Sequence, residues 1–161
     1  MPKLSHVDER GRARMVDVSE KPRTMREAVA RARVVLAPAT FRLLREGALA
    51  KGDVLTVAQL AGIQAAKRTS ELIPLCHPIA LTHAEVTLTL DETGHTVEIE
   101  ATCRTKGETG VEMEALTAVA MAALTVYDMC KAVERGITVT DLRVVHKAGG
   151  RSGEYREATE E

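Results

Sequence analysis

Val86-Thr87-Leu88-Thr89-Leu90 and, a little further on, Val97-Glu98-Ile99-Glu100-Ala101-Thr102-Cys103 are the two segments that decide the fold. Apolar and polar residues alternate in both segments, which is the pattern of β-strands with one buried face. The residues between them, Asp91-Glu92-Thr93-Gly94, have the composition of a hairpin loop. The sequence therefore predicts an antiparallel β-hairpin at this position.

A long helix is expected after the hairpin, from about Glu112 to Glu134, with Gly136 closing its C-terminus. The segment is apolar on most sides, as in a helix that is buried or shared with another subunit. Val139–His146 predicts a last strand, which leads into the glycine-rich loop Ala148-Gly149-Gly150-Arg151-Ser152-Gly153.

The segment Thr24–Leu36 is ambiguous, because its residues alternate as in a strand while its alanines and a capping-box pattern favour a helix. A short helix is expected from Pro38 to Gly47. A second helix is expected from Thr56 to about Arg68, burying Val57, Leu60 and Ala61. This order of elements predicts an α+β fold, with helices packed on one face of an antiparallel sheet.

The chain has 161 residues, so we expect one domain over residues 1–161, with flexible ends at about 1–14 and 157–161. The net charge is −1, so no overall basic field attracts nucleic acid or an anionic membrane. Aromatic residues make up 2% of the chain, which leaves few side chains on which single-stranded bases can stack. We therefore expect no nucleic-acid partner.

Three features favour a cytoplasmic protein without a membrane partner. The first residues carry mixed charges and no apolar signal-peptide core. The longest uncharged apolar run, Ala115–Tyr127, is too short to span a bilayer. The cysteines Cys76, Cys103 and Cys130 are odd in number and widely spaced, which argues against a disulfide framework.

Pro74 and Pro78 bracket His77, and each proline restricts its own backbone and that of the preceding residue. A rigidly held imidazole suits proton transfer or phosphate binding near neutral pH. The same pattern fits a proline-stiffened turn with an incidental histidine, so spacing alone leaves both interpretations open. Cys76 beside His77 lacks the usual spacing of zinc ligands, and we expect no metal site.

Four charged residues interrupt the apolar helix, Glu112 and Glu114 at its start and Asp128 and Lys131 near its end. The last two are neighbours on one helix face. Burial of such a pair can move a pKa towards neutrality, as acid–base catalysis requires. An exposed ion pair at the point where the helix leaves the core has the same spacing, and the pattern does not decide between the two.

Two lysines lie near glycines that let a backbone approach a ligand closely. Lys51 precedes Gly52, and Lys147 lies just before Gly149 and Gly150. Lysines near exposed amides can hold a polyphosphate, although most such turns only face solvent. The sequence contains no P-loop motif that would strengthen this weak signal.

Four segments resemble, in order, the motifs of the molybdenum cofactor biosynthesis protein C family. They are Lys67-Arg68-Thr69-Ser70-Glu71-Leu72-Ile73-Pro74-Leu75-Cys76-His77-Pro78, Thr109-Gly110-Val111-Glu112-Met113-Glu114-Ala115-Leu116-Thr117, Tyr127-Asp128-Met129-Cys130-Lys131-Ala132 and Lys147-Ala148-Gly149-Gly150-Arg151-Ser152-Gly153. The resemblance extends over about Leu4–Arg156. It implies a ferredoxin-like α+β fold in which residues 24–36 form a strand. It also implies a homohexamer, a trimer of dimers with active sites at the dimer interfaces.

The activity that this resemblance implies is that of a cyclic pyranopterin monophosphate synthase. Such an enzyme converts the nucleotide-derived substrate 3′,8-cyclo-7,8-dihydroguanosine 5′-triphosphate to cyclic pyranopterin monophosphate and releases pyrophosphate. The positions that match the family's catalytic residues are Asp128, Lys51 and Lys131. The positions implied to bind substrate are Leu75, Cys76, His77, Met113 and Glu114, with Arg26, Glu112 and Lys147 in supporting roles.

The chemistry of these residues agrees with the implied reaction. Asp128 with a lysine or His77 could move the protons that ring opening and closure require. The cations that stabilise a cyclic phosphate and a departing pyrophosphate could be Lys51, Lys131, Lys147 and Arg26. Rearrangement and elimination need no redox or organic cofactor, and Mg²⁺ could accompany the triphosphate.

Two functions of other classes remain open at this point. A nucleotide- or RNA-binding module without catalytic activity would be retained on RNA at low salt. A purely structural partner of other pathway enzymes would still work in the pathway after Asp128→Ala.

Overall fold

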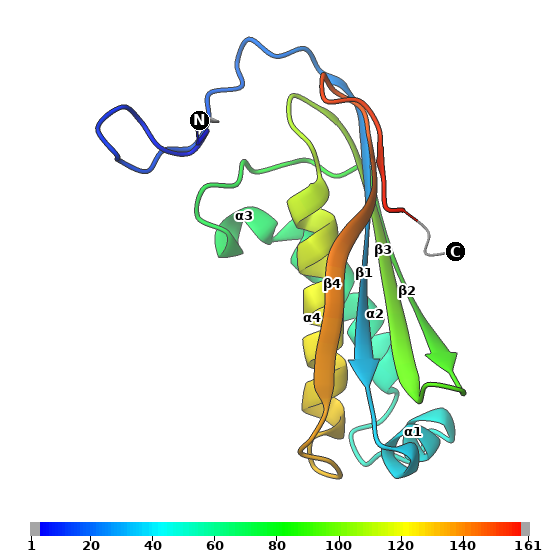
Figure 1. The fold of residues 1–161 in the computed structure, drawn as a ribbon. Coiled ribbons are helices and arrows are strands. Elements are labelled where there is room, and N and C mark those ends of the chain that lie inside the picture. Colours follow the sequence, from blue (N-terminus) through cyan, green and yellow to red (C-terminus); the bar gives the residue numbers. More distant parts are fainter. Residues whose placement is uncertain (1–3, 159–161) are drawn as a thin grey trace.

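The computed structural model describes residues 4–158, which form one antiparallel sheet with helices on one of its faces (Figure 1). The sheet has the strand order β2-β3-β1-β4-β5, with bounds β1 Thr24–Val35, β2 His83–Asp91, β3 Thr96–Gly107, β4 Thr138–Ala148 and β5 Tyr155–Arg156. The helices are α1 Pro38–Arg45, α2 Val54–Lys67, α3 Thr69–Leu72 and α4 Glu112–Cys130. The predicted α+β class is confirmed, and the arrangement is consistent with a ferredoxin-like fold.

The ambiguous segment 24–36 is the central strand of the sheet. β1 pairs with β3 on one side and with β4 on the other. From Ala28 onward, every second residue of β1 faces the helices and is at most 1% exposed, namely Ala28, Ala30, Ala32 and Val34. Packing of this face therefore overrides the helix propensity of the alanines.

The prediction for the buried face of α2 is wrong. Val57 is 43% exposed and Leu60 is 60% exposed, while Ala61 is half-buried. The helix also begins earlier than expected, with the carboxylate of Asp53 accepting a hydrogen bond from the Thr56 amide at 3.1 Å. The buried residues of this helix are instead Val54, Ala58, Gly62, Ala65 and Ala66.

Small residues on α2 face inward because they let the helix approach α4 closely. A Cβ atom added to Gly62 would lie 2.9 Å from the backbone oxygen of Ala118 on α4, closer than real Cβ atoms come. A bulky side chain on this face would push the two helices apart. The larger apolar residues Val57 and Leu60 are therefore left on the outer surface of the helical layer.

Helix α4 runs along the sheet and ends at Cys130, four residues before the predicted end. Lys131 is its C-terminal cap residue. By length and composition alone this helix could cross a membrane. More than half of the relevant window, 56%, is buried against the rest of the chain, which is expected of a core helix.

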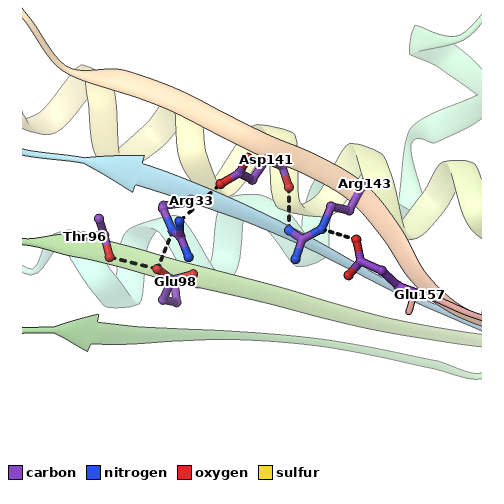
Figure 2. A network of polar contacts seen from close by, with 6 residues as sticks. All are labelled: Arg33, Thr96, Glu98, Asp141, Arg143 and Glu157. Atoms are coloured by element: carbon purple, nitrogen blue, oxygen red, sulfur yellow. Dashed lines mark hydrogen bonds and ion pairs between the residues drawn. The ribbon is translucent and has the colours of Figure 1, made fainter. Parts of the chain in front are cut away.

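The sheet face opposite the helices carries cross-strand ion pairs (Figure 2). Arg33 on β1 donates to Glu98 on β3 at 2.7 Å and to Asp141 on β4 at 3.3 Å. Arg143 donates to Glu157 at 2.7 Å. These charged side chains pair with one another on a solvated face of the sheet. The predicted site residues lie elsewhere, at the two ends of α4.

The expected flexibility of residues 1–14 and 157–161 stays a prediction. Residues 1–3 and 159–161 lie outside the described residues. Within residues 4–14, an isolated bridge joins Val7 to Ala13.

Candidate functional site

The predicted site residues form two groups, one at each end of α4. Lys51, Asp128 and Lys131 lie together at its C-terminal end. The remaining eight residues line two adjoining clefts near its N-terminal end. The helix is continuous between the groups, so Glu114 and Lys131 are about 26 Å apart at ~1.5 Å per residue.

The C-terminal group is a triad of charges around one carboxylate. The Lys51 ammonium donates to the Asp128 backbone oxygen at 2.9 Å and to its Oδ2 at 3.2 Å. Lys131 Nζ lies 2.7 Å from the other carboxylate oxygen, Oδ1. Lys51 comes from the loop between α1 and α2, where Gly52 adopts a φ of +94° that only glycine tolerates well. Tertiary packing thus unites all three predicted catalytic residues.

The electrostatics of this triad differ from those of a buried acid–base pair. Hydrogen bonds from Lys131 and then Lys51 hold the pKa of Asp128 below its usual range. The hydrogen bond to Asp128 raises the pKa of Lys131. All three side chains are about half exposed. Of the two interpretations that the spacing left open, this chain forms the exposed ion pair, with both pKa values moved away from neutrality.

The other end of α4 borders a cleft of about 280 Å³. All five residues implied to bind substrate line it, from two segments: Leu75, Cys76 and His77 after α3, and Met113 and Glu114 in the first turn of α4. The N-terminal segment contributes further lining residues, which are Ser5, His6, Val16, Val18 and Lys21. The structure therefore brings the five predicted binding residues together.

His77 and Cys76 have different environments within this cleft. The Nε2 atom of His77 lies 2.5 Å from the backbone oxygen of Val16, so the imidazole fastens the N-terminal segment to the wall of the cleft. Burial, and to a lesser extent the charge of Glu114, raises the pKa of the Cys76 thiol. Cys76 is therefore a neutral thiol in the free protein rather than a nucleophilic thiolate.

The carboxyl group of Glu114 has a pKa close to neutral pH. Its side chain is 3% exposed, and its Oε2 atom has no hydrogen-bond partner in the described chain. Burial, more than the nearby charge of Glu112, raises its pKa to about 7. A carboxyl group of this kind can both donate and accept a proton in the cleft. Sequence analysis assigned Glu114 only to the binding residues. Its position inside an apolar helix was the signal that could have indicated a role in proton transfer.

The supporting residues line a second cleft of about 430 Å³, which shares Lys21, Thr109, Gly110 and Glu112 with the first. Lys147 Nζ lies 2.6 Å from Glu112 Oε1. The Arg26 guanidinium donates to the backbone oxygens of Gly107 and Glu108, both at 3.0 Å. Both cations are therefore already engaged by the protein.

The residues of the second cleft that sequence reasoning missed include Lys21, Thr24, Arg151 and Ser152. Arg151 and Ser152 lie inside the quoted glycine-rich motif, which was a usable signal. Lys21 is one of many basic residues near the N-terminus, and nothing in its local pattern distinguishes it. Across residues 4–158, no three His, Cys, Asp or Glu side chains gather as potential metal ligands.

Comparison with known proteins adds to this geometry. A family model described as the MoaC family matches residues 15–150. A cyclic pyranopterin monophosphate synthase from Heliobacterium modesticaldum is 63% identical over 155 residues, which cover 96% of this chain and 98% of that protein. One from Thermomicrobium roseum is 62% identical over 161 residues, covering 100% of this chain and 97% of that protein. Mouse molybdenum cofactor biosynthesis protein 1 is 61% identical over 155 residues, which are 96% of this chain and 24% of that longer protein.

Proposed function

This chain belongs to the MoaC family, as its four motifs predicted, and we propose from this membership that it is a cyclic pyranopterin monophosphate synthase of molybdenum cofactor biosynthesis. Its substrate is then 3′,8-cyclo-7,8-dihydroguanosine 5′-triphosphate, and its products are cyclic pyranopterin monophosphate and pyrophosphate. The observation that carries the proposal is the grouping of all eleven implied residues at the two ends of one helix.

The two groups suit different parts of the reaction. Lys51 and Lys131 retain N–H donors beyond those that bind Asp128, and they can stabilise negative charge as the cyclic phosphate forms. The Asp128 carboxylate can accept a proton once substrate draws one of these lysines away. Glu114 supplies the proton donor and acceptor that ring opening and closure need at neutral pH. The cleft around Leu75, His77 and Met113 holds the base-derived part of the substrate.

A single chain separates these two groups by too great a distance for one nucleotide, so we propose that each active site is shared between two chains. Antiparallel pairing of two α4 helices about a two-fold axis brings the start of one helix beside the end of the other. The helical layer carries exposed apolar residues that such contacts can cover, namely Val57, Leu60, Leu124 and Val133. The assembly that we propose is a homohexamer built as a trimer of dimers.

Other features of the proposal follow from the chemistry and the surface. The reaction is a rearrangement with elimination, so it needs no redox or organic cofactor, and Mg²⁺ can accompany the substrate triphosphate. The charged residues of the outer sheet face pair with one another, and we propose no nucleic-acid partner and no membrane partner. The protein acts in the cytoplasm.

The test is to incubate the purified protein with the cyclic dihydro-GTP substrate and to measure pterin and pyrophosphate separately. Equal amounts of the two products, formed in proportion to enzyme, are expected. Retention of the protein on RNA at low salt without any turnover would favour a binding module instead. A strain that depends on this protein and still makes the cofactor with Asp128→Ala would favour a structural role.

A further inference from the structure

The glycine-rich loop after β4 forms one wall of the second cleft and has little backbone structure of its own. Gly150, Arg151 and Ser152 line that cleft. Residues 149–153 lie outside the strands, and Gly153 donates to the backbone oxygen of Gly150 over a long 3.4 Å. Three of these five residues are glycines, which lose more conformational entropy on ordering than any other residue. The loop therefore depends on contacts at its ends to keep one conformation.

His146, three residues before this loop, joins the two sides of its base. The Nε2 atom of the imidazole lies 3.0 Å from Oε1 of Glu154, the residue that follows the loop. The Nδ1 atom lies 3.4 Å from Oε1 of Glu27 on β1. A neutral imidazole can donate to one of these carboxylates and a protonated imidazole to both. Either form therefore keeps His146 attached to at least one of them.

Charged groups from three strands surround this imidazole. On β5, Arg156 Nε lies 2.7 Å from the Glu154 oxygen that His146 contacts, and Arg104 on β3 donates to Glu27. The hydrogen bond from His146, and then the charge of Arg156, holds the pKa of Glu154 below its usual range, so this residue is an ionised acceptor at neutral pH. The His146 side chain is 16% exposed, so water screens its contacts less than those of a fully exposed pair.

Consecutive residues of β4 fasten the base of the loop on both faces of the sheet. Side chains alternate along a strand, so those of His146 and Lys147 point to opposite faces. On the helical face, Lys147 pairs with Glu112 at the start of α4. On the outer face, His146 pairs with Glu27 and Glu154. The backbone pairing that closes this hairpin is short, since β5 has two residues (Figure 1). The side-chain contacts therefore supply much of the hold on the loop.

We propose that His146 is a positioning residue, which joins Glu27 on β1 to Glu154 after the glycine-rich loop and so holds the loop in the conformation that completes the second cleft. His146 lines neither cleft, so it acts through the loop. Without it the loop samples other conformations, and the fraction of the protein that is ready to bind substrate falls. Asp128 and Glu114 lie outside the loop, so proton transfer by them should continue unchanged. The effect on turnover rests on the proposed function, whereas the effect on the loop does not.

Amide hydrogen exchange of the full-length protein, followed by mass spectrometry, measures the order of the loop. In His146→Leu, peptides that cover residues 149–154 should exchange about two- to fivefold faster, the loss expected for one partly exposed ion pair. Glu154→Ala should have a similar effect, and the double variant should exchange little faster than either single variant. His83→Leu is the matched control, because His83 pairs with Glu85 on β2 at 3.5 Å and lines neither cleft.

The kinetic constants of the same variants give a readout that a general loss of stability would not produce. His146→Leu should raise KM for the substrate by about two- to fivefold and leave kcat unchanged, because binding is weakened and chemistry is not. His146→Gln keeps a side-chain N–H donor, so it should return both KM and loop exchange towards the wild-type values.

Several outcomes would overturn the positioning role. They are unchanged loop exchange in His146→Leu, faster exchange spread over the whole chain, a wild-type KM, a loss confined to kcat, and an equal effect in His83→Leu. Exchange is measured without substrate, so it does not depend on turnover. Faster exchange confined to the loop of His146→Leu, when the wild-type protein does not convert the substrate, would refute the proposed function and retain the hold of His146 on the loop.

Discussion

The ammonium group of Lys51 donates to both the backbone oxygen and the carboxylate of Asp128, although the two residues lie 77 positions apart in the sequence. Lys131 binds the other oxygen of the same carboxylate. Exposed ion pairs of this kind contribute little to folding stability. The convergence of the three side chains is therefore better explained by the catalytic role that we propose for them than by a contribution to the fold.

Replacing Asp128 with alanine should abolish most of the activity and leave the assembly intact. Removal of a general base typically costs about 10²–10⁴-fold in rate. The carboxylate lies on the surface, so its loss should hardly change the melting temperature. The measurements are kcat for pterin formation and the elution volume in size-exclusion chromatography. The control is Glu71→Ala, another exposed carboxylate, and turnover near the wild-type rate in Asp128→Ala would refute the assignment.

The buried carboxyl of Glu114 should make folding stability depend on pH. Its pKa is about 7 in the folded protein and 4.5 in the reference state, so between these values the folded chain binds more protons than the unfolded chain. Stability should therefore fall as the pH rises from about 4.5 to 7, by about 3 kcal/mol at most for this one group. In Glu114→Gln, which stays neutral, this decrease should disappear. Urea denaturation at pH 5 and pH 7.5 measures the difference.

Glu71→Gln is the control for this pH dependence, because Glu71 is exposed and its removal should leave the slope unchanged. Equal pH slopes in the wild type and in Glu114→Gln would contradict the raised pKa. The pH profile of kcat gives a second readout, since a wild-type limb near pH 7 should be lost or displaced in Glu114→Gln.

The pair formed by Lys147 and Glu112 should give non-additive effects on substrate binding. Lys147→Met leaves the Glu112 carboxylate without its partner at the rim of both clefts, where it repels the substrate's phosphates. Adding Glu112→Gln removes that repulsion, so the double variant should bind the triphosphate more tightly than Lys147→Met alone. Dissociation constants for the four members of the cycle test this. Strictly additive losses would mean that Lys147 contacts phosphate independently of Glu112.

The elements that the sequence predicted well are those whose signal is local. The hairpin of β2 and β3 and the long helix α4 follow from periodicity within each segment. The inward face of α2 was predicted wrongly, because it depends on how closely Gly62 lets the helix approach α4. The sequence of α2 alone does not predict the distance between the two helices.

The same limit applies to the site. The motifs contained nine of the eleven implied residues, all except Arg26 and Lys51. The proximity of Lys51 to Asp128 arises only from tertiary packing. The pKa of Glu114 depends on burial by neighbouring elements. Lys21 was recognised as a residue of the cleft only from its position beside the glycine-rich loop in the structure. The sequence was thus sufficient to identify most of the site residues. It was not sufficient to predict their protonation states or whether their side chains pair with other residues of the protein.

Complementation between two inactive variants should reveal whether active sites are shared. Helix α4 is unbroken from Glu112 to Cys130, so one chain cannot bring both Glu114 and Lys131 to the reacting atoms of one nucleotide. In a dimer of Glu114→Ala with Lys131→Ala, one of the two sites keeps both wild-type residues. Equal mixing with full exchange should therefore restore about a quarter of the wild-type sites. Mixing Asp128→Ala with Lys131→Ala is the matched control and should restore none, because both residues come from the same end of one helix. Subunit exchange verified with a fluorescent label, without return of activity in the first mixture, would exclude a shared site.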